Sequence, residues 1–575
     1  MISSKQHISH TLTGDGVGTH LVLVLPSPKG ANMPDKVGKA EEKYGGLFDL
    51  CFPEKLTLLK IPYDDEDIGE EVPAGLKKML RSRGHSKLVD SAEVIKTLPM
   101  RPYEPDWDPT EFFTGHFEPL LKGSGQGHDT VFFVGPGSAY MTAVMTQLAF
   151  SMGAEIIANA PHDESGVCQA ASFAFVTRGI EGYRSLFAGL SDRTRNDKTR
   201  RARNVLVKLL DGGFYNGRWA PARALSGGRN RAEPLGVSKS IAPLSGLIEE
   251  EETKDGKKYS LNAAGLVAAI ETKKHHERAH GSPYDYDDDT ILDSREVSRA
   301  RGVITGVRAL APDPTFDEHP QFTAAEYCDG CANGAEGFDP IALVLSHISS
   351  TMDCKFSKYP LPTEMAKAFR QRGKTIEATL RSVCGPDWDP ELHFTQAMDS
   401  ILKLDRHGVY WYVDVTGLIN QDQIVFSLIG HLLKIPIRYR MITQGIGAGG
   451  RVVEKPARTR FPPDLHKLTT PSYSVWRMIT ELAIEGRVND EVSAVLDSMQ
   501  TPDDFLLKED YDRIMSLMSD KTGQIHRARV EDKLQKDGIF TTRTEQRQGK
   551  ADLTGWALTR GGRILWAFLQ ASKEE

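Results

Sequence analysis

The chain has 575 residues, a net charge of −7 and a mean hydropathy of −0.37. One hydrophobic core cannot serve a chain of this length, and typical domain sizes predict about four domains. No apolar run reaches the roughly 18 residues of a membrane span, and the start, MISSKQHISHTLTGDGVG, lacks the apolar core of a secretory signal. Six scattered cysteines suit a reducing compartment better than a disulfide framework. We therefore expect a cytoplasmic protein with no membrane partner.

The sequence contains an internal repeat. PDWDPTEFFT begins at Pro105, and PDWDPELHFT begins at Pro386, 281 positions later. The same offset, without a gap, places HDTVFFVGPGSAYMT from His128 opposite VYWYVDVTGLINQDQ from Val409. A period of about half the chain indicates a duplicated unit rather than a solenoid repeat.

Each unit begins with features of an α/β domain. The first opens with an apolar run of strand length, Thr19 to Gly30, and we take Asp339 to Ser350 as its counterpart. An amphipathic helix follows in each unit, at Ala74 to Ser82 and at Thr363 to Arg372.

A strand, a tight turn, a helix and a second strand come next. In the first unit Thr130 to Val134 is a fully buried strand, GPGS breaks it, Met141 to Met152 has helical spacing, and Ala154 to Ile157 is a strand. The second unit repeats this as strand Tyr410 to Val415, turn TGLIN, helix Gln421 to Lys434 and strand Ile435 to Met441. Such βαβ units predict a parallel, doubly wound (Rossmann-like) sheet in each half.

A different pattern follows each α/β unit. Helices are predicted at Ala202 to Leu210 and Ser238 to Leu247, then two short strands around KDGKKY with an Asp-Gly turn, then a helix after Asn262. Helices followed by a β-ribbon are typical of a winged helix-turn-helix. The segment Arg527 to Leu569 has the same pattern. SLNAAGLVAAI and ALTRGGRILWAFL share the end of a strand, a Leu-Asn or Leu-Thr start, a glycine and an apolar helix.

The predicted order is therefore α/β, winged helix, α/β, winged helix. The boundaries we assign are 1–165 for the first Rossmann-like domain, 190–275 for the first winged helix, and 276–300 for a polar linker. The second Rossmann-like domain spans 301–445 and the second winged helix 465–575.

Polar loops follow the predicted strands. In open parallel sheets, ligands bind where strand ends meet helix starts. GPGSAYM and TGLINQ offer backbone N–H groups, a hydroxyl and a helix N-terminus, which suit a phosphate or another anion. PSPKG and SHISS would lie at the same edges. The alternative is ordinary turn chemistry. The candidate ligand-binding residues in these loops are Ser27, Lys29, Gly135, Gly137, Ser138, Tyr140, Ser346, His347, Thr416, Gly417, Asn420 and Gln421.

The combination resembles the CARF family (CRISPR-associated Rossmann fold), whose members sense cyclic oligoadenylate made by type III CRISPR systems. YVDVTGLIN looks like that family's strand and D-x-T-G-G element, at Asp414, Thr416 and Gly417, and LVLVLPSPKG looks like its first strand and loop. Here Leu418 replaces the usual second Gly, Asn420 stands where Lys is common, and the first copy has Phe133 and Gly135 in place of Asp and Thr. CARF domains work as pairs across a two-fold ligand, so the resemblance implies cyclic oligoadenylate as ligand, no other cofactor, and Asp414 as a further ligand-binding residue.

The predicted winged helices raise the question of DNA. Between Arg193 and Lys239 there are 12 Lys or Arg against 3 acids. Such a basic excess suits phosphate contacts, with the second helix of the motif in the major groove. The alternative is a dimer or protein-docking module. The candidate DNA-binding residues are Arg200, Arg201, Arg203, Arg229, Arg231, Lys239, Arg527, Arg529 and Lys533.

Two other motifs, CDGC and PDWDP, contain residue types that can bind metal or act in catalysis. CDGC (Cys328, Cys331) is half of a zinc site, with no second CxxC or HxxxH, so free thiols in a loop are favoured and no metal is expected. PDWDP superficially resembles the opening of a PD-(D/E)xK nuclease, yet no E-x-K follows on a strand. Trp107 and Trp388 are better explained as anchors of a packed turn.

Three functions stay open. The first is a ligand-gated, DNA-binding transcription regulator in antiviral CRISPR defence, in which cyclic oligoadenylate reorients two winged helices, acting on double-stranded DNA as a monomer or homodimer. The second is a ring nuclease or effector nuclease, with His347, Ser138 or Asn420 as candidates for positioning the reaction, although no catalytic set is recognisable. The third is a scaffold for a CRISPR-associated protein.

Overall fold

A computed structural model provides the fold. It describes the following residues: 19–25, 36–60, 71–96, 129–134, parts of 142–150, 154–162, 168–187, 193–225, 240–279, 300–307, 340–350, 375–384, 388–403, 409–415, 420–433, 437–438, 441–443, 458–460, 505–507, parts of 509–513, 540–545 and 553–558.

The first sheet has six strands: β1 (Thr19–Leu25), β2 (Lys55–Lys60), β3 (Glu93–Lys96), β4 (Asp129–Val134), β5 (Glu155–His162) and β6 (Cys168–Ser172). Their order is β3-β2-β1-β4-β5-β6, and only β6 is antiparallel to its neighbour. The predicted strands in 19–25, 130–134 and 154–157 are thereby confirmed, as is a doubly wound parallel arrangement.

Both faces of this sheet are covered, which explains why its central strands β1 and β4 carry nearly continuous apolar runs. Every residue of β1 is buried. Leu21 and Leu23 share a core with α2 (Val37–Leu50), α3 (Ala74–Ser82) and α4 (Ser86–Asp90). Val22 and Val24 belong to the larger core on the opposite face. The predicted helix Ala74 to Ser82 has the bounds of α3.

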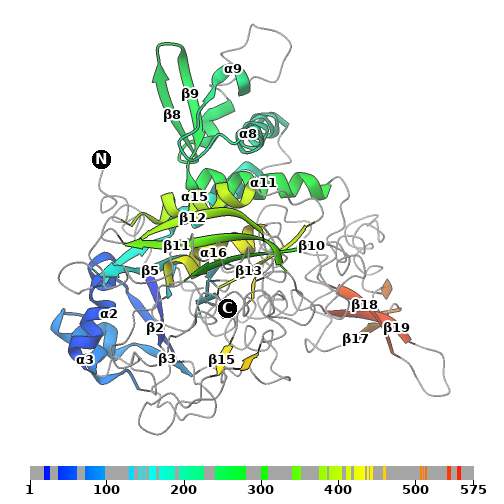
Figure 1. The fold of residues 1–575 in the computed structure, drawn as a ribbon. Coiled ribbons are helices and arrows are strands. Elements are labelled where there is room, and N and C mark those ends of the chain that lie inside the picture. Colours follow the sequence, from blue (N-terminus) through cyan, green and yellow to red (C-terminus); the bar gives the residue numbers. More distant parts are fainter. Residues whose placement is uncertain are drawn as a thin grey trace.

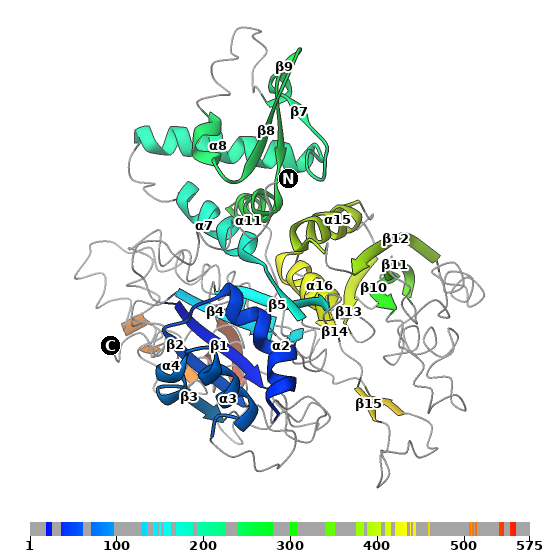
Figure 2. The same ribbon diagram turned by 90° about the vertical axis from the view of Figure 1, so that its left-hand side faces the viewer.

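The second sheet has five strands, all parallel: β10 (Ala300–Val307), β11 (Pro340–Ser350), β12 (Thr375–Cys384), β13 (Val409–Asp414) and β14 (Ile437–Arg438). Its order, β12-β11-β10-β13-β14, repeats that of the parallel strands of the first sheet. Two helices pack with it, α15 (Pro390–Leu402) and α16 (Asn420–Leu433). Figure 2 shows the two sheets side by side, the first in blue and cyan and the second in green and yellow.

The strand order corrects one predicted correspondence. The central position that β1 holds in the first sheet belongs in the second to β10, a segment for which no strand was predicted. The segment Asp339 to Ser350 forms β11 instead, the counterpart of β2. The predicted strand Ile435 to Met441 is also divided, because β14 ends at Arg438 and β15 (Met441–Thr443) pairs with β16 (Arg458–Arg460) in a separate ribbon.

Helices and a hairpin follow the first sheet. They are α7 (Ala174–Phe187), α8 (Arg193–Asp211), β7 (Ala220–Pro221), α9 (Ala222–Leu225), the 3-10 turn η1 (Ala242–Leu244), β8 (Ile248–Thr253), β9 (Gly256–Leu261) and α11 (Ala263–Ala279). Residues 193–279 are called the first module below. In Figure 1 its hairpin β8–β9 projects beyond α8, and α11 lies between this hairpin and the second sheet.

Two local predictions in the first module are corrected. The helix predicted over Ser238 to Leu247 gives way at Ala242 to η1, where Pro243 removes a backbone donor, and Gly246 then adopts φ +82°. The hairpin is confirmed, but Lys254 and Asp255 form its turn, and Gly256, with φ +107°, is already the first residue of β9.

Near the end of the chain, β17 (Phe505–Leu507), β18 (Phe540–Glu545) and β19 (Leu553–Leu558) form a three-stranded antiparallel sheet. Its order, β17-β19-β18, repeats the order β7-β9-β8 of the first module. None of the helices in the described part of the chain combines the length and the apolar character that crossing a bilayer requires.

Helices α7 and α11 approach neighbouring backbone closely at two glycines. A Cβ on Gly265 of α11 would lie 1.8 Å from the carbonyl oxygen of Leu247, and one on Gly179 of α7 would lie 2.5 Å from the carbonyl oxygen of Ala264. Each contact meets backbone, which cannot move aside as a side chain does. Gly265 stands in the phrase SLNAAGLVAAI, so its place in the sequence reflects this close packing.

We therefore expect Gly265→Ala to destabilise the protein by about 1–3 kcal/mol through overpacking. Gly38→Ala in α2 is the matched control, because no atom lies within 4 Å of its Cβ position. That variant should be neutral or stabilising by about 0.5–1 kcal/mol. Chemical denaturation of both variants measures the difference, and equal stabilities would contradict the packing described here.

Candidate functional site

Each sheet has one point at which its strand order reverses. In the first sheet it lies between β1 and β4, and in the second between β10 and β13. The parallel strands end at a common edge, with β1 ending at Leu25, β4 at Val134, β10 at Val307 and β13 at Asp414. Ligands of open parallel sheets bind at this carboxyl edge, at the reversal of strand order.

Most predicted ligand residues follow these strand ends in the sequence. Ser27 and Lys29 come after β1, and Gly135, Gly137, Ser138 and Tyr140 come after β4. Thr416 and Gly417 come after β13. All eight lie outside the described residues. Asp414 is the last residue of β13, where its backbone pairs with Thr305 of β10 and Arg438 of β14. Asn420 opens α16.

Ser346 and His347 are not loop residues, as had been predicted. Both lie within β11, where Ser346 pairs with Gly306 and His347 pairs with Val307. Because β11 stands on the far side of β10 from β13, these two residues are one strand away from the reversal point. The sequence misled because the apolar run of β11 resembles β1 more than β10 does.

Gln421 has a structural role at the candidate site. Its side chain is 9% exposed, and its Nε2 donates a hydrogen bond of 2.7 Å to the carbonyl oxygen of Asn159 in β5. This bond ties the start of α16 to the first sheet. One of the two donors of the amide nitrogen is therefore used within the chain itself.

The residues 281 positions apart occupy matching places. Phe132 and Val134 of β4 belong to the same core as their equivalents, Val413 of β13 and Val415, the residue that follows this strand. Because side chains alternate along a strand, an offset changed by one would place them on opposite faces. The helical residues between 142 and 150 are buried at the same positions as their equivalents in α16.

The two helices that follow the reversal points meet. Phe150 and His431 stack with ring centroids 5.8 Å apart and an interplanar angle of 18°. These residues are themselves 281 positions apart. In a two-fold arrangement, a residue near the axis contacts its own equivalent. The contact is thus the one expected if the two sheets are related by an internal two-fold axis through this helix pair.

Lys60 is a candidate that sequence reasoning missed. It ends β2, pairs in register with Leu25 at the end of β1, and is only 5% exposed. Its Nζ donates to the carbonyl oxygen of Glu71. A buried ammonium group therefore lies at the carboxyl edge, beside the end of β1. The sequence signal was a lysine ending an apolar strand, KLTLLK.

The second PDWDP element organises the start of α15. The Oδ1 atom of Asp389 accepts hydrogen bonds from the backbone N–H groups of Glu391 (2.9 Å) and Leu392 (3.2 Å), and Pro390 occupies the first turn. Trp388 is 8% exposed and packs against Phe173, with ring centroids 5.9 Å apart. The prediction that Trp388 anchors a packed turn is confirmed, whereas Trp107 lies outside the described residues.

A buried polar chain joins α15 to α16. Trp388 Nε1 donates to His393 Nδ1 over 3.1 Å, and His393 Nε2 lies 3.0 Å from Oδ1 of Asp422. Because the indole N–H can only donate, Nδ1 of His393 is the accepting nitrogen of the first contact. The start of α16, next to the loop TGLIN, is therefore fixed by residues of the PDWDP element.

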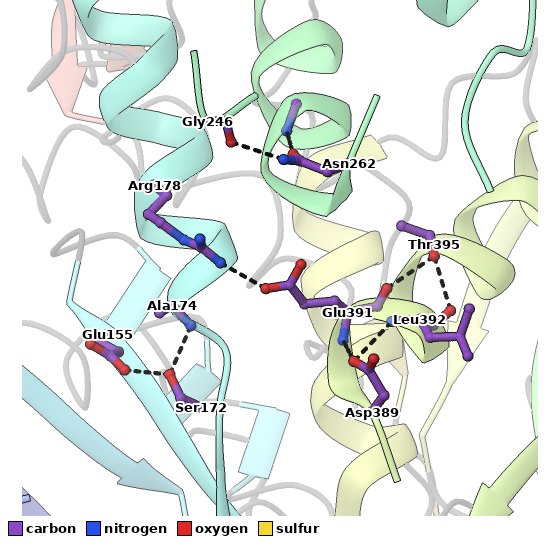
Figure 3. A network of polar contacts seen from close by, with 11 residues as sticks. Glu155, Ser172, Ala174, Arg178, Gly246, Asn262, Asp389, Glu391, Leu392 and Thr395 are labelled. Carbon is purple, nitrogen blue, oxygen red and sulfur yellow. Dashed lines mark hydrogen bonds and ion pairs between the residues drawn. The ribbon is translucent and has the colours of Figure 1, made fainter. Parts of the chain in front are cut away.

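Charged contacts connect α15 to the helices that follow the first sheet. Figure 3 shows Arg178 of α7 and Glu391 of α15 pointing toward one another, with Nη2 and Oε1 2.7 Å apart. Further along, Asp399 accepts from Arg218 of the first module and from Lys403, whose Nζ lies 2.7 Å from Oδ2. The Arg218 guanidinium also lies 5.0 Å from the ring centre of Tyr215. One helix of the second half thus holds the module of the first half.

The predicted DNA-binding residues of α8 in the first module differ in their exposure. Arg200 and Arg201 are exposed on α8. Arg203 is buried, at 7% exposure, and its Nη1 donates to the carbonyl oxygen of Leu186 over 2.7 Å. The prediction for Arg203 is therefore wrong, because its guanidinium holds α8 against the end of α7. The others lie outside the described residues: Arg229, Arg231, Lys239, Arg527, Arg529 and Lys533.

In the described part of the chain no group of three or more His, Cys, Asp or Glu residues could hold a metal ion. Cys328 and Cys331 lie outside the described residues. Cys51 is buried, and burial raises the pKa of its thiol to about 12.

Comparisons with known proteins give distant similarities. No family model matches the sequence, and no curated protein matches it significantly. Among solved structures, a type III CRISPR defence DNA nuclease activated by cyclic oligoadenylate is 11% identical, with 94% of this chain and 86% of that chain covered and a TM-score of 0.28. Can2 from Sulfobacillus thermosulfidooxidans, in complex with cyclic tetra-adenylate, is 11% identical, with 62% and 95% covered and a TM-score of 0.16. Protein VC1899 from Vibrio cholerae is 9% identical, with 66% and 97% covered and a TM-score of 0.15. At these scores the similarities do not define the fold, which follows from this chain's own strand order and register.

The stacked His431 makes the helix pair sensitive to acid. Burial lowers the pKa of His431 to about 3. Between about 6.5 and about 3, the unfolded chain binds a proton at this position that the folded chain excludes, so stability is lost as the pH falls. His431→Phe removes that proton uptake, and at pH 5.5 it should lessen the acid-induced loss by about 1.4 kcal/mol.

Denaturation at pH 7.5 and pH 5.5 measures this. Phe150→Leu is the control, because it weakens the stack but leaves the titrating group, and so should lower stability equally at both pH values. An unchanged pH dependence in His431→Phe would show that His431 is not excluded from protonation.

Proposed function

We propose that the chain is a sensor in which a two-fold symmetric, anionic ligand, cyclic oligoadenylate, binds across the carboxyl edges of the two sheets. The proposal rests chiefly on the contact between Phe150 and His431, equivalents 281 positions apart. Loops that follow equivalent strands then face a common axis. A ring with its own two-fold symmetry would present the same groups to both halves.

The chemistry of the edge supports an anionic ligand. The sequence there supplies glycines, hydroxyl groups and a helix N-terminus, which together bind phosphates through backbone N–H groups. Lys60 adds a positive charge one strand from the reversal point. The resemblance of YVDVTGLIN and LVLVLPSPKG to CARF elements, carried by Asp414, Thr416 and Gly417, points to the same ligand class.

The output of the sensor is proposed to be DNA binding. The two three-stranded antiparallel sheets, β7-β9-β8 and β17-β19-β18, have the strand order expected for the hairpin region of a winged helix. The first of them is preceded by α8, which carries the exposed Arg200 and Arg201. The contacts of α15 provide the connection, because this helix reaches both the start of α16 and the first module. A ligand that draws the two edges together would therefore move the module.

A titration with cyclic tetraadenylate and cyclic hexaadenylate tests the ligand. A ligand present at 100 times its dissociation constant stabilises the folded state by about 2.7 kcal/mol, and its melting temperature should rise accordingly. Lys60→Gln should weaken binding about tenfold, in line with the loss of one charge-assisted contact. Lys77→Gln on the exposed side of α3 is the matched control and should bind like the wild type.

If neither ring raises the melting temperature, and linear oligoadenylate does not raise it either, the proposal that this protein binds oligoadenylate is refuted. Release of linear products during the same incubation would favour a ring nuclease over a pure sensor.

The coupling through α15 is tested by charge reversal. Arg218→Asp places two carboxylates together beside Lys403 and should loosen the module, reducing the effect of ligand on DNA affinity toward unity. Arg218→Lys keeps the positive charge opposite Asp399 and is the matched control, which should retain the coupling. If Arg218→Asp alone leaves the ligand effect intact, the signal does not pass through this contact.

A further inference from the structure

The two three-stranded antiparallel sheets, β7-β9-β8 and β17-β19-β18, can be aligned residue by residue through their strand pairing. Tyr259 of β9 and Trp556 of β19 are both buried, and each pairs with the short third strand, at Ala220 and Leu506. On the other side Tyr259 pairs with Glu250, and Trp556 pairs with Thr542. These anchors make β8 the counterpart of β18 without a gap.

The counterparts differ in charge. Strand β8 reads IEEEET, and all four glutamates, Glu249 to Glu252, are exposed. At the matching register positions β18 carries Thr541, Thr542, Arg543 and Thr544. An acidic run in one ribbon is thus replaced by a neutral run with one arginine in the other.

Both faces of strand β8 in the first hairpin carry negative charge. Side chains alternate along a strand, so Glu249 and Glu251 lie on one face and Glu250 and Glu252 on the other. The lysines opposite them do not restore a positive surface. Lys257 is engaged with Glu250, at 3.1 Å between Nζ and Oε2, and Lys258 stands opposite Glu251.

The two hairpins therefore differ in the electrostatic interaction they would have with DNA. DNA carries one phosphate charge per about 1.7 Å of helix axis, so a strand with four exposed carboxylates is repelled from it. The C-terminal ribbon, from Phe540 to Leu558, has Arg543, Arg547 and Lys550 against Glu545 and Asp552. It lacks the acidic run and offers cations at the strand and in the segment that follows.

We propose that the two hairpins have different roles: β18–β19 contacts the phosphate backbone of double-stranded DNA, and β8–β9 does not. This inference rests on the proposed DNA binding and deepens it. The bound site is then asymmetric. One half of the site is contacted through the β18–β19 hairpin, and the other through the helical part of the first module, so the DNA target need not be a palindrome.

Matched charge reversals in the two ribbons test the inference on the full chain. Affinity for a mixed-sequence duplex is measured over a range of salt concentrations, with and without cyclic tetraadenylate. Arg543→Glu in β18 should weaken binding about tenfold and lower the slope of log affinity against log salt by about 1. Lys257→Glu with Lys258→Glu in β9 should leave affinity within about twofold of wild type.

Arg543→Gln keeps the test valid if Arg543→Glu folds poorly. It removes the positive charge without adding a negative one and should show the same change in salt slope.

The outcomes separate the inference from the proposed function. If wild type binds the duplex and the β9 double variant loses as much affinity as Arg543→Glu, the hairpins are equivalent and the inference is overturned. It is likewise overturned if both Arg543 variants bind like wild type. If wild type binds no duplex under any of these conditions, the proposed DNA binding itself fails.

Discussion

The packing of the helical residues between 142 and 150 against α16 is the constraint on which the rest of the structure depends. Each helix follows the strand at which the order of its sheet reverses. Bringing these helices together, with Phe150 on His431, fixes which edges of the two sheets can share a ligand. The hydrogen bond from Gln421 to Asn159 adds a directional contact between the same two halves, which apolar packing alone does not supply.

A second constraint concerns α15. Its first turn is capped by Asp389, anchored by Trp388 and in contact with α16 through His393, and its last turns hold Arg218 through Asp399. The hydrogen bond from Trp388 to His393 gives the second copy of the ten-residue element a role in holding α15. In the other half, the position equivalent to His393 is Phe112 and that of Asp422 is Met141. Both polar partners are replaced together, so the buried polar chain belongs to one half only.

Much of the fold could be predicted, because periodicity and buried runs mark strands and helices directly. Strand Thr130 to Val134 and helix Ala74 to Ser82 were found in this way. Strand β10 was missed, since Ala-Arg-Gly-Val-Ile-Thr-Gly-Val has two glycines and an arginine in place of a continuous apolar run. Its place in the sheet comes from pairing with β11 on one side and β13 on the other, which no local sequence pattern indicates. Arg203 was misassigned for a related reason, because its charge was visible in the sequence but its contact with the Leu186 carbonyl depends on how α8 meets α7. Lys60 was overlooked because a single lysine ending a strand is unremarkable until the register places it beside Leu25.

Both sheets belong to one polypeptide, and this has a consequence for how the pair can evolve and operate. Two separate identical subunits would have to place like upon like at their axis, phenylalanine on phenylalanine or histidine on histidine. A single chain is free to put Phe150 against His431, and each side of the junction can mutate alone. Dilution cannot separate the two sheets either, so the contact between Phe150 and His431 forms at any protein concentration.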